Sequence, residues 1–95
     1  MIRHIVFFSA KDPADVQRIE QGLTMLASIP EHETFEVRRS LNADDLTGGA
    51  VDVVVYAEFA DAAALARYKA HPTYQSCIDV VRPLRDLRLA ADIAS

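Results

Sequence analysis

The sequence predicts an α+β fold in which helical segments cover one face of a four-stranded antiparallel sheet. Three observations lead to this prediction. Four short runs are rich in Ile, Val, Phe and Leu and have strand character, at residues 2–9, 34–41, 51–59 and 87–93. Helical patterns fill the two intervals 12–29 and 61–82. The order of these elements is a split β-α-β unit repeated, which is the ferredoxin-like β-α-β-β-α-β sandwich.

The first strand is apolar on both faces at its centre. Alternation places His4, Val6 and Phe8 on one face and Ile5 and Phe7 on the other. We expect the face with His4 to be covered by helices, because it matches the more continuous apolar face of strand 51–59.

The segment 12–29 predicts a helix that begins at Asp12-Pro13 and ends before Pro30. A carboxylate can cap the free amides, and Pro fits the first helical position. The apolar stripe of this helix comprises Val16, Ile19, Leu23 and Leu26. Gly22 lies on the same buried face, where it predicts a close approach of helix to sheet or space left for a ligand; an edge glycine with no role is the alternative.

Two further strands follow, at 34–41 and 51–59, joined by the acidic, glycine-rich stretch 42–49. This stretch predicts a connecting loop. The pair Gly48-Gly49 does not indicate a phosphate site, because the Gly-x-x-x-x-Gly-Lys pattern is absent.

The segment 61–82 predicts a helix pair. Asp61 is a capping residue, and Pro72 restarts the chain in a second helix. Tyr68 and His71 fall on one face of the first helix, and Tyr74 shares the apolar stripe of the second.

Composition excludes several classes of function. The chain has 95 residues, 51% of them apolar, with a net charge of −4, so we expect one domain, residues 1–95, and no nucleic-acid partner. No apolar run approaches the roughly 20 residues that span a bilayer, so no membrane association is expected. The single cysteine, Cys77, cannot form an internal disulfide, and no leader sequence is visible. A cytoplasmic location is therefore expected.

The apolar residues on the uncovered sheet face predict a homodimer. Monomeric proteins rarely expose a patch such as Ile5, Phe7, Val54 and Tyr56. A second copy packed face to face would cover it.

Polar side chains of the covered face predict a pocket for a small, largely apolar or aromatic molecule. His4 and Tyr68 are the candidate catalytic residues, because an imidazole can accept a proton and a phenol can stabilise an oxyanion. The predicted ligand-binding residues are His4, Val6, Ile19, Gly22, Leu23, Val55, Ala57, Tyr68, His71 and Tyr74. The alternative for each histidine is a structural role, such as capping a helix. The third histidine, His32, is expected to be solvated in a polar turn, and the spacing of the histidines and cysteine predicts no metal site.

Several motifs together resemble the stress-responsive α/β-barrel (Dabb) family. They are the opening Met1-Ile2-Arg3-His4-Ile5-Val6-Phe7-Phe8, the helix ending in Ser28-Ile29-Pro30, the strand into Phe59, and Leu65-x-x-Tyr68-x-x-His71-Pro72. The resemblance implies a ferredoxin-like protomer that dimerises into an α+β barrel.

The resemblance also implies candidate activities. One plant member is a cofactor-free polyketide cyclase, whose strand-one His and helix Tyr match His4 and Tyr68. Tyr74 stands where that cyclase has a catalytic His, and Gly22 where it has a pocket Tyr. A lyase or cyclase without a cofactor, a cofactor-free monooxygenase by analogy of fold, and a structural or stress-associated interaction protein are the alternatives to simple ligand binding.

Overall fold

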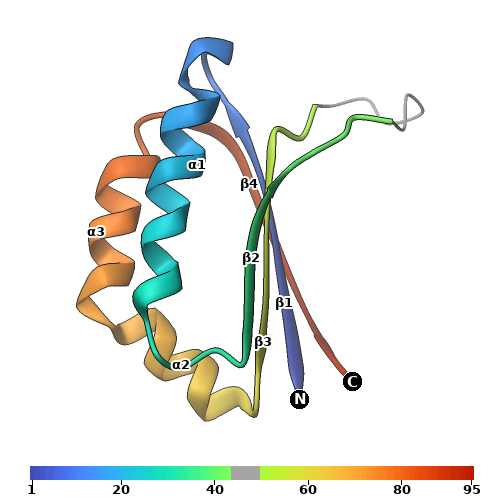
Figure 1. Ribbon diagram of the computed structural model, residues 1–95, viewed down its shortest axis with the longest axis vertical. Coiled ribbons are helices and arrows are strands. Elements are labelled where there is room, and N and C mark those ends of the chain that lie inside the picture. Colours follow the sequence, from blue (N-terminus) through green and yellow to red (C-terminus); the bar gives the residue numbers. More distant parts are fainter. Residues whose placement is uncertain (44–49) are drawn as a thin grey trace.

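The chain forms one four-stranded antiparallel sheet in the order β2-β3-β1-β4, with its helices on one face (Figure 1). The computed structural model describes residues 1–43 and 50–95. The predicted loop at 42–49 therefore lies almost wholly outside the described residues. The strands are β1 (Ile2–Ala10), β2 (Thr34–Arg39), β3 (Val53–Phe59) and β4 (Arg85–Ala94). This is the ferredoxin-like α+β fold that the element order predicts.

Each predicted helical interval is confirmed, with shorter α-helices than expected. The Asp12 carboxylate accepts the Ala14 amide at 3.0 Å, and the Asp61 carboxylate accepts the Ala64 amide at 2.8 Å. The first interval is α-helical only in its centre and tightens to 3₁₀ turns at both ends. The helical segments are η1 (Pro13–Asp15), α1 (Val16–Thr24), η2 (Met25–Ser28), α2 (Ala62–Ala70) and α3 (Pro72–Val81). None of the helices in the described part of the chain is long and apolar enough to cross a membrane.

Strand β1 lies inside the sheet, and its pairing fixes which side chains share a face. His4 pairs with Ala57 of β3 and with Asp92 of β4, and Phe8 pairs with Arg88. His4, like Val6 and Phe8, is buried beneath the helices. Ile5 and Phe7 are only half-buried because they lie on the other, open face.

Strand β4 is an edge strand that the helices leave largely uncovered. Helix α1 packs on β1, β2 and β3, whereas the residues 86–94 of β4 are exposed. Side chains on the helix side of β4 therefore form a rim beside the core rather than a part of it.

The helices α1 and α3 approach closely at Gly22. A Cβ atom at this position would lie 2.9 Å from Val81 Cγ2 and 3.1 Å from Val80 Cγ1. The predicted close approach is therefore real, but it joins two helices; the expectation that it joins helix and sheet was wrong. The side chains of Val80 and Val81 in α3 occupy the space beside Gly22, and their branching at Cβ leaves them few other rotamers.

We predict that Gly22→Ala changes stability with a sign that depends on Val81. In the natural background, overpacking of about 1–3 kcal/mol outweighs the gain of about 1 kcal/mol in helix propensity, so the free energy of unfolding falls. In a Val81→Ala background the closest clash is removed and the exposed Val80 side chain can shift, so Gly22→Ala raises the free energy of unfolding. Urea denaturation of the four proteins measures the coupling, which we expect to be at least about 1 kcal/mol.

The matched control is Gln21→Ala, which changes an exposed neighbour in the same helix. Its effect should be the same in both backgrounds. Additive effects of Gly22→Ala and Val81→Ala would contradict the close-contact explanation.

Candidate functional site

A cavity of about 260 Å³ lies between the helices and the sheet. Side chains from β1 and β3 form one wall, the helical segments form the opposite wall, and arginines lie at the rim beside β4. Six of the ten predicted ligand-binding residues line it: His4, Val6, Leu23, Val55, Tyr68 and Tyr74. Eight further residues line the cavity that the sequence analysis does not predict. They are Phe8, Leu26, Cys77, Ile78, Val81 and the three rim arginines, Arg82, Arg85 and Arg88.

The other four predicted residues lie elsewhere. Ile19 and Ala57 have no exposed surface and belong to the packed core. Gly22 faces the α3 valines. His71 is the N-cap of α3, where its Nδ1 accepts the Thr73 amide at 3.1 Å. His71 therefore has the structural role that was the alternative to ligand binding, because α2 ends at Ala70 and His71 caps the helix that follows.

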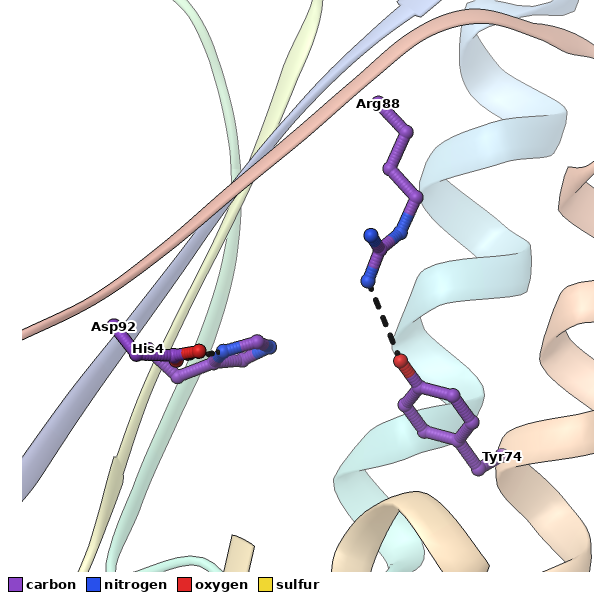
Figure 2. Close-up of polar contacts among 4 residues, drawn as sticks. All are labelled: His4, Tyr74, Arg88 and Asp92. Atoms are coloured by element: carbon purple, nitrogen blue, oxygen red, sulfur yellow. Dashed lines mark hydrogen bonds and ion pairs between the residues drawn. The ribbon is translucent and has the colours of Figure 1, made fainter. Parts of the chain in front are cut away.

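His4 is held by a carboxylate that sequence reasoning missed. The imidazole is buried, and its Nδ1 lies 2.5 Å from Asp92 Oδ1 (Figure 2). An ionised carboxylate can only accept, so Nδ1 carries the hydrogen, and in the neutral imidazole Nε2 then keeps its lone pair. Figure 2 shows the far end of the ring pointing away from Asp92, toward the side where Tyr74 and Arg88 meet. Alternation in the last strand indicates which other residues share a face with Asp92. It does not indicate that Asp92 pairs with His4, because the register between the two strands cannot be derived from that pattern.

Tyr68 is the most deeply placed phenol of the site. Only 1% of the residue is exposed, and its ring centroid lies 4.9 Å from that of Phe59 and 6.3 Å from that of His4. Burial, with smaller contributions from Tyr74 and Cys77, raises the pKa of Tyr68 well above its usual range. The hydroxyl therefore stays protonated at physiological pH and can donate a hydrogen bond.

Tyr68 and His4 each have a polar atom that makes no hydrogen bond to the described residues. Among the hydrogen bonds of residues 1–43 and 50–95, none involves the Tyr68 hydroxyl or His4 Nε2. No fully buried side-chain nitrogen or oxygen of these residues lacks a partner. Both atoms are therefore accessible, and both residues line the cavity.

Tyr74 lies at the open end of the cavity with Arg88. The Tyr74 ring packs edge-on against Tyr68, with 5.3 Å between centroids. Arg88 Nη2 donates a hydrogen bond of 3.4 Å to the Tyr74 hydroxyl (Figure 2). This contact directs the guanidinium toward the cavity.

Cys77 contributes a thiol rather than a thiolate to the wall. Burial raises the pKa of Cys77 to about 11. The side chain is therefore protonated at neutral pH and is a poor nucleophile. The described residues contain no group of three His, Cys, Asp or Glu side chains placed to hold a metal ion.

His32 is half-buried and packs against an aromatic ring, so the expectation of a solvated side chain was wrong. Its ring stacks on Phe35 with 4.9 Å between centroids, and its Nε2 lies 3.3 Å from the Leu26 carbonyl. The neighbouring glutamates suggested a polar turn, but the aromatic partner is three residues away on β2.

Comparison with known proteins places this geometry in a family. The stress-responsive A/B barrel domain model, Dabb, matches residues 2–95. No curated protein matches the chain significantly.

Solved structures share the fold over nearly the whole chain. A dimeric ferredoxin-like protein of unknown function from Thermobifida fusca is 28% identical, covers 99% of this chain and 90% of its own, and has a TM-score of 0.80. A dabb family protein from Mesorhizobium loti is 26% identical, with coverages of 99% and 95% and a TM-score of 0.80. A dimeric ferredoxin-like protein of unknown function from Jannaschia is 19% identical, with coverages of 99% and 98% and a TM-score of 0.84. The chain therefore belongs to the stress-responsive A/B barrel domain (Dabb) family.

Proposed function

We propose that this protein is a homodimer that binds a small, largely apolar or aromatic molecule in the cavity beneath its helices. The observation that carries this proposal is that His4 Nε2 and the Tyr68 hydroxyl belong to residues lining a cavity with largely apolar walls and make no hydrogen bond to the described residues. Ligand pockets have this composition, with apolar walls and a few polar groups that fix orientation. A cytoplasmic location stays a prediction of the sequence.

The pair of His4 and Asp92 favours one enzymatic function as a second candidate. A carboxylate that holds Nδ1–H orients the ring and stabilises the imidazolium that forms when Nε2 accepts a proton. The Tyr68 hydroxyl could then donate a hydrogen bond to an enolate. This division of roles suits a lyase or cyclase that removes a proton next to a carbonyl group and needs no cofactor.

The homodimer rests on the open face of the sheet. Its centre is the predicted patch of Ile5, Phe7, Val54 and Tyr56, each half-buried within the protomer. Strand β4 extends the patch with Leu89, which is 58% exposed. Apolar side chains from three neighbouring strands are thus available for a second sheet, and solved relatives described as dimeric support this arrangement.

We predict that 1-naphthol, an uncharged aromatic alcohol, binds in the cavity and shifts the methyl resonances of Val6, Leu23 and Val55. Tyr68→Phe should weaken binding about 2- to 13-fold, since one net hydrogen bond contributes about 0.5–1.5 kcal/mol. The control is Tyr56→Phe, which removes a phenol from the open face and should leave the affinity unchanged. Resonance shifts confined to other surfaces, or equal effects of the two variants, would contradict a cavity ligand.

A second prediction concerns the hydrogen on His4. We expect the Nδ1–H tautomer in the natural protein, because Asp92 accepts from Nδ1. Asp92→Ala should move the population toward the Nε2–H tautomer. Long-range proton–nitrogen spectra of ¹⁵N-histidine-labelled protein measure this, with His32 as an internal reference. An unchanged His4 tautomer in Asp92→Ala would remove the support for an oriented base.

A third prediction concerns assembly. The protein should sediment as a dimer at micromolar concentration. Phe7→Glu should produce a folded monomer, because dimerisation would bury the new carboxylate in the apolar patch. Gln21→Glu on the exposed side of α1 adds the same charge and should stay dimeric. A natural protein that sediments as a monomer under these conditions contradicts the proposed homodimer.

A further inference from the structure

The rim of the cavity is positively charged, whereas the molecule as a whole carries a net negative charge. The whole chain is acidic, with 14 Asp and Glu residues against 10 Lys and Arg. The cavity lining nevertheless includes Arg82, Arg85 and Arg88 and no acidic residue. Cations gathered at a concave apolar site attract and concentrate anions there.

These arginines have no carboxylate partner within the described parts of the chain. The arginines that do form ion pairs there are Arg18, Arg38, Arg39 and Arg67. The single side-chain hydrogen bond of Arg88 among these residues goes to the neutral Tyr74 hydroxyl, at 3.4 Å. That bond orients the guanidinium and leaves its charge unneutralised, with other N–H groups still available.

The position of Arg88 separates it from the candidate base. Arg88 and Asp92 lie on the same side of β4, four residues apart, so their Cα atoms are about 13 Å from each other at roughly 3.3 Å per residue. His4 lies beside Asp92, and Figure 2 shows the Arg88 side chain reaching to the Tyr74 hydroxyl, on the side toward which the His4 ring points. An anionic group bound by Arg88 would thus lie at the rim, and the rest of the molecule would extend into the cavity toward His4.

We propose that the ligand of this cavity is an amphipathic carboxylic acid whose carboxylate binds Arg88, with Arg85 and Arg82 adding positive charge at the rim. The guanidinium presents a planar fork that matches a carboxylate with two parallel hydrogen bonds. The aromatic or aliphatic body of the acid fills the cavity toward His4. This inference rests on the proposed small-molecule binding function and specifies its substrate class.

The test compares 2-naphthoate with 2-naphthamide, which has the same shape and no charge, by titration calorimetry. We expect the natural protein to bind 2-naphthoate at least tenfold more tightly than 2-naphthamide. Arg88→Gln should weaken 2-naphthoate binding by about tenfold or more, since hydrogen bonds to charged groups contribute about 1.5–3 kcal/mol. Its affinity for 2-naphthamide should stay within about twofold, which reports an intact cavity.

The charge-matched control is Arg67→Gln, on α2 and outside the cavity lining. It should keep the full preference for the acid. Equal binding of the two probes by the natural protein, or an undiminished preference in Arg88→Gln, overturns the carboxylate site and leaves the proposed ligand-binding function standing. Failure of both probes to bind the natural protein contradicts the proposed function itself, and the carboxylate site with it.

Discussion

The pairing of β1 on both of its edges is the constraint on which the rest of the structure depends. Because β1 lies between β3 and β4, its pairing with each strand fixes which side chains of all three strands lie on the same face of the sheet. One register brings His4 beside Asp92 under the helices and Phe7 beside Leu89 on the open face. A shift by one residue would expose the imidazole and bury the wrong side chains. The cavity and the apolar patch are thus two results of one hydrogen-bonding pattern.

In the proposed function, the two faces of the sheet would serve assembly and ligand binding separately. The open face has apolar side chains from neighbouring strands and suits a flat contact with a like surface. The covered face combines an apolar interior with a polar rim, because β4 extends beyond the helices that cover β1 and β3. In the proposed function, the uncovered edge strand would be the side from which a ligand reaches the buried His4.

Alternation and capping signals in the sequence were sufficient for the fold, the faces of the strands and six of the fourteen residues that line the cavity. The period-two pattern places His4 and Val6 together whatever the exact register. Asp92 was missed because register between distant strands is decided by packing, which the local pattern does not contain. Arg85 and Arg88 were missed because charged residues on an edge strand have the same pattern as a solvated surface, and Arg82 because it lies at the end of a helix, where a cation is ordinary. His71 was assigned to a face of the first helix, but that helix ends one residue earlier, at residue 70, which the three-residue spacing alone does not indicate.

The contact between Gly22 and the valines of α3 has a consequence for how relatives of this protein could diversify. Helix α3 contributes Tyr74, Cys77 and Val81 to the cavity wall. It can lie this close to α1 only because residue 22 has no side chain. A larger residue there would push one cavity wall outward without touching any bound molecule. Ligand size could then change during evolution through a substitution in the packing between helices, while every residue in contact with the ligand stayed the same.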